Sequence, residues 1–473
     1  MNALEKVDYR KFIAPIVVGL IIWFAGPLRP DALSLSAWHM FAIFVATIIG
    51  LVTKPLPLGA IALIGFVVTV LTGIMPMEKA VAGFGNSAIW LIVMAFFISR
   101  GFIKTGLGRR IALIFVRAFG KQTLGLAYAL SAVDLIVAPG TPSNTARAGG
   151  VMFPIIKSLA QTFNSDPVDG SERRIGTFLI FTEFHANMIT AAMFLTAMAG
   201  NPIAQAFAGK QGIHITWMGW FLAALVPGLI SLIVVPFVIY KVYPPEQKAT
   251  PDAKNWATGE LATMGKVSKA ETMMIIGFVS ALVLWITGAI TGIDATTTGF
   301  LVIGFLLVAG VLSWQDILKE SGAWNTLFWF SVLVMMASAL NTLGFIPWLS
   351  QTIGNSLHGM NWFVVLVILV LAYFYSHYFF ASSTAHVSAM YAAFLAVALA
   401  AHVPPMLAAL MLGFFGNLMA ATTHYSSGPA PILFGSGYVK QSDWWRLNFI
   451  LGLIYIVIWV GVGSLWMKLL GMW

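Results

Sequence analysis

Long apolar runs, each about the length of a membrane crossing, recur from one end of the 473-residue chain to the other. A helix needs about 20 mostly apolar residues to cross a bilayer, and the alternation typical of membrane-spanning strands is absent from these runs. The pattern therefore predicts an all-α polytopic membrane protein with about eleven transmembrane helices. The predicted spans are residues 12–28, 37–53, 57–76, 87–103, 176–199, 213–241, 272–291, 296–313, 323–346, 404–436 and 447–470.

Two further apolar regions, 122–165 and 361–402, are each interrupted by a polar cluster. The first contains "APGTPSNTARAGG" at 138–150 and the second contains "FFASSTAHVSAM" at 379–390. The arms on either side are short, and basic residues flank the first region at both ends. Non-helical backbone is tolerated at membrane depth where it lines a cavity. We therefore expect two re-entrant helical hairpins, which enter and leave the membrane on the same face.

The basic residues are distributed unevenly between the predicted loops. With a cytoplasmic N-terminus and eleven spans, the outer loops and C-terminus hold 4 of the 26 basic residues, and one lies in a hairpin. The other 21 are cytoplasmic, as the positive-inside rule requires. We expect a multi-pass protein of the cell inner or plasma membrane, with its C-terminus outside. The net charge of +9 is thus a property of the loops and does not indicate a nucleic-acid partner.

The chain divides into two halves that resemble each other. A polar loop at 242–270 separates them. "NSAIW" at 86–90 corresponds to "NTLFW" at 325–329, and "SNT" at 143–145 corresponds to "SST" at 382–384, both at an offset of 239 residues. Since an odd number of spans lies between the matching segments, we expect inverted-topology repeats. Paired interrupted segments in such repeats indicate the midplane binding site of a transporter.

This arrangement predicts five parts of the chain. They are scaffold helices of the first half at 1–117, a transport part with the first hairpin and an interrupted helix at 118–243, a cytoplasmic linker at 244–270, scaffold helices of the second half at 271–350, and a second transport part at 351–473.

The residues at the hairpin tips suit the binding of an anion. Helix ends at a tip expose unpaired backbone amides, and serine, asparagine and threonine both cap such ends and offer donors. Helix N-termini that point at one place favour negative charge. Two tips could each hold one carboxylate, which predicts a dicarboxylate-like ligand. The alternative is that these side chains only satisfy broken helix ends. The predicted tip residues are Ser143, Asn144, Thr145, Ser382, Ser383 and Thr384.

The paired tips, the two halves and "SSGPAPILFGSG" at 426–437 resemble the divalent anion:sodium symporter (DASS) family over essentially the whole chain. The resemblance implies transport of di- or tricarboxylate anions, a homodimer in the lipid bilayer, and an elevator-like movement of a transport domain against a fixed scaffold. It also implies that the two tip triplets carry the substrate carboxylates.

The segments "SSTAHVSAM" and "THYSSGPAPILFGSG" are similar to the sodium-independent exchanger branch of that family. That similarity implies antiport of small dicarboxylates of the 2-oxoglutarate, malate, succinate and fumarate type. A sodium-coupled symporter is the alternative. The turns of the interrupted helices depart from the T-P-x-N-like pattern of sodium-coupled members. They add Pro202, Ser427 and Pro429 to the predicted site. Asn187 and Asn417 on these helices either contact the ligand or link helices.

Four ionisable residues at repeat-related positions are candidates for charge balance. Arg147 and His386 each follow their triplet by two residues, and His185 and His424 lie 239 apart. Ionisable side chains inside a membrane are functional candidates by default. A fixed cation could neutralise the substrate in place of sodium and so enforce exchange. Alternatively, Arg147 caps carbonyl groups, and the histidines are hydrogen-bonded packing residues.

Two acids also lie in apolar runs. Asp134 and Glu183 are either part of a proton relay or partners for Arg147 and for another helix. We favour the second interpretation.

Other function classes fit less well. The chain has no cysteine, which excludes disulfides and cysteine-ligated metal, and no Walker-type loop indicates a nucleotide-driven pump. A membrane-embedded hydrolase needs a nucleophile with a base in reach, whereas the two tips carry similar chemistry symmetrically, as transport predicts. We expect no enzymatic activity, no metal and no cofactor. An anion channel is separated from a transporter only by flux kinetics.

Overall fold

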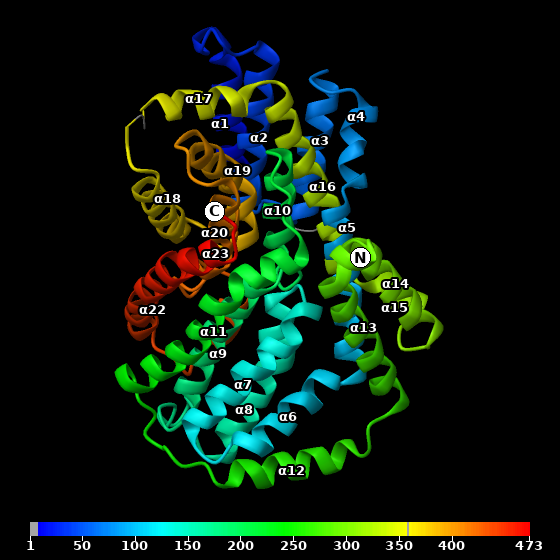
Figure 1. The fold of residues 1–473 in the computed structure, drawn as a ribbon, viewed down its shortest axis with the longest axis vertical. Helices are drawn as coiled ribbons and strands as arrows, with labels where there is room; N and C mark the ends of the chain where they lie inside the picture. Colours follow the sequence, from blue (N-terminus) through cyan, green and yellow to red (C-terminus); the bar gives the residue numbers. More distant parts are fainter. Residues whose placement is uncertain (1–7, 357–358) are drawn as a thin grey trace.

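The computed structural model describes residues 8–356 and 359–473, and this part of the chain is helical, with no named β-strand (Figure 1). Nine of the described helices are long and apolar enough to cross a membrane, and three shorter apolar helices accompany them. The prediction of an all-α polytopic membrane protein is therefore confirmed.

The first half begins with the 3₁₀ turn η1 (Tyr9–Phe12), and the π-helical segment η5 (Ala146–Met152) leads into α8. Its helices are α1 (Ile13–Phe24), α2 (Leu35–Thr53), α3 (Leu58–Leu71), α4 (Met77–Val81), α5 (Ser87–Thr105), α6 (Leu107–Phe119), α7 (Thr123–Val137), α8 (Phe153–Thr162), α9 (Gly176–Met193), α10 (Gly200–Lys210) and α11 (Trp217–Val242).

The second half follows a linker helix, α12 (Asp252–Met264). Its helices are α13 (Lys269–Thr291), α14 (Ala295–Val308), α15 (Trp314–Lys319), α16 (Ser321–Thr342), α17 (Phe345–Ser356), α18 (Trp362–Ser376), α19 (Ser383–Ala400), α20 (Pro405–Leu418), α21 (Pro429–Gly435), α22 (Gln441–Ile456) and α23 (Ser464–Leu469).

The two halves present the same order of elements. In each, a helix pair (α7 with α8, and α18 with α19) is followed by a broken helix (α9 with α10, and α20 with α21) and then by a long helix. The breaks fall at residues 194–199 and 419–428, inside the predicted spans 176–199 and 404–436. The interruptions expected from the glycine and proline positions therefore occur in both halves.

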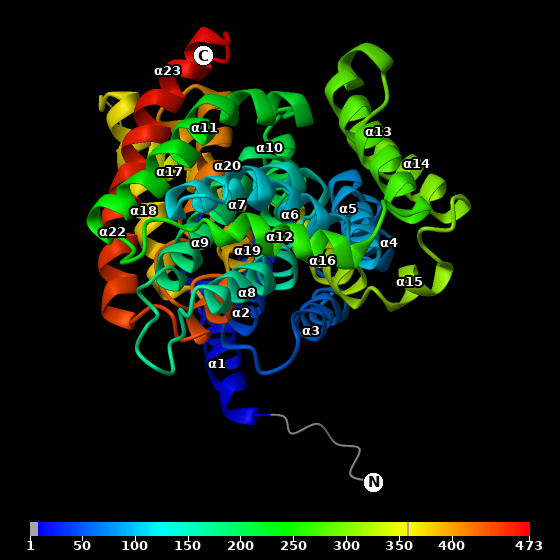
Figure 2. The same ribbon diagram turned by 90° about the horizontal axis from the view of Figure 1, so that it is seen from below.

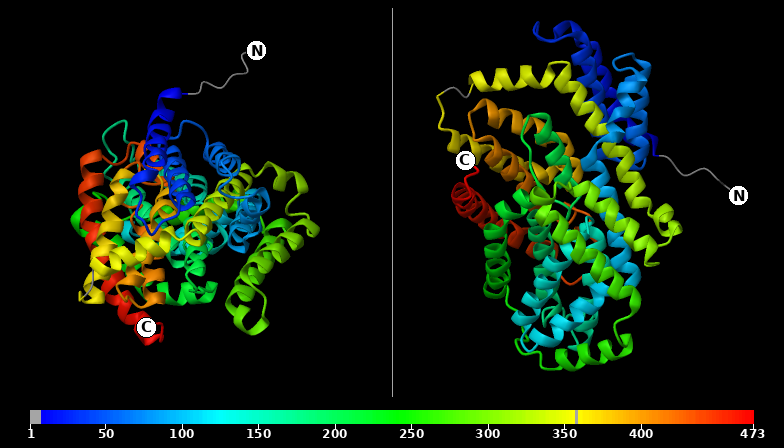
Figure 3. Two further views of the ribbon diagram at one scale, coloured as in Figure 1. Left: turned by 90° about the horizontal axis from the view of Figure 1, so that it is seen from above. Right: turned by 45° about the vertical axis from the view of Figure 1, so that its right-hand side comes forward.

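The helices pack as two groups. One group contains α7 to α11 and α18 to α22, with α9 at its centre, where every residue of α9 is buried. The other contains α1 to α5 and α13 to α16, and α13 and α14 lie at one edge of the molecule (Figure 3). Helix α10 belongs to the first group but contacts both α5 and α16 of the other, so it lies at the boundary between the two groups.

In Figure 2, α1 begins near the bottom of the view and α23 ends at the top. The two ends of the described chain thus lie at opposite ends of this view.

A buried ion pair attaches the linker to the group of helices that contains α13. Arg110 on α6 is held by Glu271 at the start of α13, with Nη2 donating to Oε2 at 3.2 Å. The same guanidinium donates to the carbonyl oxygen of Gly265 at 3.0 Å, just after α12. Because Glu271 also completes a capping box with Ser268, this contact fixes the start of α6, the linker and the start of α13 together.

Candidate functional site

The two predicted hairpin tips meet at one cavity of about 240 Å³. Both triplets contribute to its lining, although their matching positions are 239 residues apart in the chain. Residues in the breaks of the two broken helices, with Pro429 next to the second break, complete this side of the cavity. The lining residues of these segments are Pro142, Ser143, Asn144, Thr145, Met198, Ala199, Ser382, Ser383, Thr384, Ser427, Gly428 and Pro429.

Each tip is closed by an equivalent serine cap. The Ser143 hydroxyl accepts a hydrogen bond from the backbone N–H of Ala146 at 3.2 Å. The Ser382 hydroxyl accepts one from the N–H of Ala385 at 3.3 Å. Each serine satisfies one of the free amides at a helix start. For these two residues the structure therefore supports the alternative role, in which tip side chains satisfy broken helix ends. Two polar groups of the lining have no hydrogen-bond partner among the described residues, namely the Ser427 hydroxyl, which can donate, and Asn144 Oδ1, which can only accept.

The starts of several helices surround the cavity. The α10, α16 and α19 helices begin at or beside its lining residues, as does the helical segment that follows the first tip. Each start carries a partial positive charge from the helix dipole. None of the described residues in the lining has a charged side chain. Positive electrostatic potential inside the cavity therefore comes from backbone amides and helix ends.

The loop of the second broken helix touches the first tip closely. A Cβ atom added at Gly428 would overlap the Thr145 hydroxyl and lie 3.2 Å from its Cβ. The backbone of Gly428 has φ −60° and ψ −41°, which any residue adopts. Glycine is therefore required here for the close approach and not for its backbone conformation.

The opposite wall of the cavity belongs to the group of helices that contains α1 to α5 and α13 to α16. Our sequence analysis did not assign this wall to the site. It consists of Leu58, Phe96, Gly322, Asn325, Thr326 and Trp329. The Asn325 side chain also accepts a hydrogen bond from the N–H of Gly59 at 3.2 Å, which joins α16 to the start of α3. A signal was present, because "NTLFW" at 325–329 had identified this segment as a repeat partner of 86–90.

Arg147 is fully buried and does not line the cavity. Its Nε donates to Oδ1 of Asp134 at 2.9 Å. Its two other nitrogens donate to four further acceptors, namely the carbonyl oxygens of Thr141, Asn187 and Ala197 and the hydroxyl of Thr190. A guanidinium has five N–H groups, so none remains for a ligand. This arrangement favours the structural alternative for Arg147 and the interpretation of Asp134 as its partner.

Glu183 lies on the face of α9 that carries Asn187 and Thr190, since positions four and seven residues apart share a helix face. It is buried, and within the described chain neither carboxylate oxygen accepts a hydrogen bond.

The two asparagines on the broken helices link helices and do not line the cavity. Asn187 donates to Oδ1 of Asp134 at 3.1 Å. Asn417 donates to Oδ1 of Asn201 at 2.6 Å, and Asn201 in turn donates to the carbonyl oxygens of Ala191 and Phe194. Of the two roles that the sequence left open for these asparagines, ligand contact and the linking of helices, the structure supports the linking of helices. Pro202 is buried in α10 outside the lining, whereas Ser427 and Pro429 lie within it.

The three histidines also lie outside the lining. His185 joins α9 to the last long helix through Tyr455 at 2.7 Å and Asn448 at 2.9 Å. His386 lies behind the second tip, where its Nδ1 is 2.8 Å from Nδ1 of His377.

His424 accepts a hydrogen bond from the Trp445 indole at 3.1 Å. These contacts correspond to the packing alternative given for the histidines.

The chain matches the family described as "Sodium:sulfate symporter transmembrane region" over residues 6–473. The chain belongs to this family. The membership confirms the resemblance to divalent anion:sodium symporters, and this family member is a multi-pass membrane protein whose named relatives are transporters and not enzymes.

Three relatives of this family member are similar over nearly its whole length. The candidate malate transporter YflS of Bacillus subtilis (strain 168) is 57% identical and covers 97% of this chain and 96% of its own. Dicarboxylate transporter 1 of spinach chloroplasts is 46% identical, over 99% of this chain and 83% of its own. The L-tartrate/succinate antiporter of Escherichia coli O157:H7 is 38% identical, over 98% of each chain.

Two solved transporters share the fold at low sequence identity. The YdaH transporter of Alcanivorax borkumensis gives a TM-score of 0.58 at 11% identity, over 83% of this chain and 88% of its own. MtrF of Neisseria gonorrhoeae gives 0.56 at 10% identity, over 98% and 96%. At these identities the likeness concerns the fold alone.

Proposed function

We propose that this protein is a secondary transporter that exchanges small dicarboxylates, with one substrate held between the two tips. The observation that carries the proposal is the single cavity lined by both repeat-related triplets. The relatives support the substrate class, since their names refer to malate, dicarboxylates, and tartrate with succinate. The last of these is named an antiporter, which supports exchange.

The substrate charge is balanced by helix ends and tip donors in this proposal, and not by the fixed cations that we expected. Arg147 is already paired with Asp134. A dianion would instead meet the starts of α10, α16 and α19 together with the free amide and hydroxyl groups of both tips. No sodium ion is needed for this binding step.

A reconstituted exchange assay tests the proposal. Proteoliposomes that contain malate or 2-oxoglutarate should take up external radiolabelled malate rapidly, whereas empty vesicles should take it up slowly. At each of two pH values, the uptake rate should be the same in sodium buffer as in potassium buffer. A rate that rises with sodium would support the symporter alternative. Equal uptake by loaded and empty vesicles would contradict exchange.

A negative charge at the first tip should abolish binding. We expect Asn144→Asp to lose uptake of malate, because its carboxylate would repel the substrate inside a low-dielectric cavity and like-charge juxtaposition costs several kcal/mol. Asn164→Asp is the matched control, since Asn164 is exposed on the loop after the same helix pair and outside the lining. Equal uptake by the two variants in the same vesicles would remove the first tip from the site.

The transport cycle that we propose is an elevator movement of α7–α11 and α18–α22 against a homodimeric scaffold of α1–α5 and α13–α16, with the N-terminus cytoplasmic. Repeat symmetry gives the other end point. The cavity now lies beside Asn325, whose repeat equivalent is Asn86. Asn86 lines a separate polar cavity of about 360 Å³ between α5, α10 and α14.

The movement predicts two cross-linkable states in a chain that has no cysteine of its own. Thr326→Cys with Ser427→Cys should cross-link in the conformation described here, because both residues line one cavity. Ser87→Cys with Ser427→Cys should cross-link only after the movement, and malate turnover should increase its rate. A second pair that never reacts in active vesicles would contradict the elevator.

A further inference from the structure

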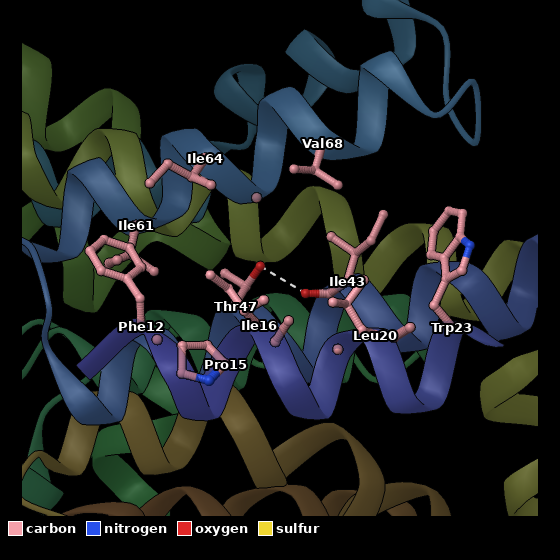
Figure 4. Close-up of a pocket in the computed structure, with 15 residues that line it drawn as sticks. Phe12, Pro15, Ile16, Leu20, Trp23, Ile43, Thr47, Ile61, Ile64 and Val68 are labelled. Carbon is pink, nitrogen blue, oxygen red and sulfur yellow. Dashed lines mark hydrogen bonds between the residues drawn. The ribbon is translucent and has the colours of Figure 1, made fainter. Parts of the chain in front are cut away.

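An apolar groove of about 250 Å³ lies on the outside of the molecule, away from the transport cavity (Figure 4). Helix α2 forms its floor, because α1 and α3 both pack on α2. The side chains of Phe12, Ile16, Leu20 and Trp23 follow one wall along α1. Residues of α3, from Ile61 to Val68, form the other wall. The groove thus runs along α1 and remains open at the surface.

The chemistry of the groove is that of a hydrocarbon site. Thr47 is its only hydroxyl among the described lining residues, and this hydroxyl donates to the carbonyl oxygen of Ile43 at 2.8 Å (Figure 4). The groove extends from Phe12 to Trp23. At 1.5 Å per residue that is about 16 Å, roughly half of the bilayer hydrocarbon thickness of about 30 Å. The length matches one leaflet, which is the depth that a single acyl chain occupies.

The two ends of the groove differ in charge. At the Phe12 end, Arg10 and Lys11 precede α1, and Lys54 follows α2, which runs antiparallel to α1. All three are exposed, and none of their side chains takes part in an ion pair within residues 8–356 and 359–473. One acid, Asp8, lies beside them and caps the N–H of Arg10 at 3.2 Å.

At the Trp23 end, the ring of Trp23 stacks on His39 at 3.7 Å between centroids. The Arg29 guanidinium there is half-buried and donates to the carbonyl oxygens of Gly26 and Leu33. The exposed cationic side chains are therefore concentrated at the Phe12 end.

We propose that this groove is a binding site for one anionic phospholipid. One acyl chain lies between α1 and α3 on the floor of α2, and the phosphate of the headgroup lies among Arg10, Lys11 and Lys54. Neither the membership of the family nor the proposed exchange requires such a site. The combination of a leaflet-long apolar groove and three free cations at one end identifies a lipid, since the tail and headgroup of a lipid have the same separation of apolar and anionic parts.

The test uses the full-length protein, purified in detergent and exposed to dioleoyl phosphatidylglycerol. Native mass spectrometry should detect one retained phosphatidylglycerol per chain at activation energies that remove other lipids, and phosphatidylcholine should be retained less. Glycerol 3-phosphate, which has the anionic headgroup without tails, should not compete.

Ile64→Trp should fill the groove and eliminate the retained lipid. Leu63→Trp is its matched control, because Leu63 is the adjacent residue, equally exposed at 45%, and outside the lining.

The triple variant Arg10→Gln, Lys11→Gln and Lys54→Gln should lose the preference for phosphatidylglycerol, by about fivefold for each cation removed. The triple variant Lys254→Gln, Lys266→Gln and Lys269→Gln removes the same charge elsewhere and should keep the preference. Equal retention in Ile64→Trp and Leu63→Trp would overturn the proposal. Cross-linking of an Ile16→Cys variant to a second copy in native membranes would also overturn it, since the groove would then be a subunit interface.

Discussion

Gly428→Ala should reduce malate exchange by about 5- to 100-fold while leaving the protein folded. The new methyl group would overlap the Thr145 hydroxyl at the first tip. Overpacking of this kind costs about 1–3 kcal/mol, and each 1.4 kcal/mol is about tenfold in an equilibrium constant. Because Gly428 and Thr145 both line the cavity, the displacement would act directly on the substrate. The measurement is initial exchange rate in proteoliposomes at a malate concentration below saturation.

Two variants make this result specific. Gly435→Ala places the same methyl group on α21, where no atom outside the helix lies within 4 Å of it, and should exchange normally. Gly428→Ala with Thr145→Ala removes the overlapping hydroxyl and should exchange at the rate of Thr145→Ala alone, a non-additive result expected for residues in contact. Additive losses in the double variant would show that Gly428 acts through another contact.

Arg147→Met should lower stability strongly, by about 3–5 kcal/mol, which is the usual cost of removing one partner of a buried ion pair. The substitution leaves Asp134 without its cation and removes one donor from each of three carbonyl groups. We expect a large fall in the midpoint of thermal unfolding in detergent. Asp134→Asn combined with Arg147→Met should recover part of the loss, because the remaining buried charge is removed.

The exposed pair of Arg109 with Glu260 provides the comparison. Arg109→Met should change stability by no more than about 1 kcal/mol, as is typical of surface ion pairs. If Arg147→Met instead keeps its stability and gains uptake into empty vesicles, Arg147 balances substrate charge and its structural role is secondary.

Much of the architecture is predictable from the sequence because it depends on local patterns. Runs of apolar residues give the helices, and the serine, glycine and proline positions give the breaks at 194–199 and 419–428. The convergence of residues 143–145 and 382–384 was predictable from their matching places in the repeats.

The roles of individual polar residues depend instead on partners distant in the chain. Arg147 and Asp134 are 13 residues apart, and the sequence allows both a paired and a free guanidinium. Asn417 meets Asn201 across 216 residues, a contact that no local spacing indicates. The α16 wall of the cavity was missed for a similar reason, since Asn325 and Trp329 lie near the start of an ordinary apolar helix.

The cavity between the two tips has an uncharged lining, and this affects the electrical work of transport across a polarised membrane. In the exchange that we propose, a domain that carries a dianion between such walls moves two negative charges through the membrane voltage, at a cost or gain of about 4.6 kcal/mol per 100 mV. Replacing one dianion by another on the return journey cancels that electrical work. A swap of diacids is therefore electroneutral, and its rate should be the same whether or not the vesicles are energised.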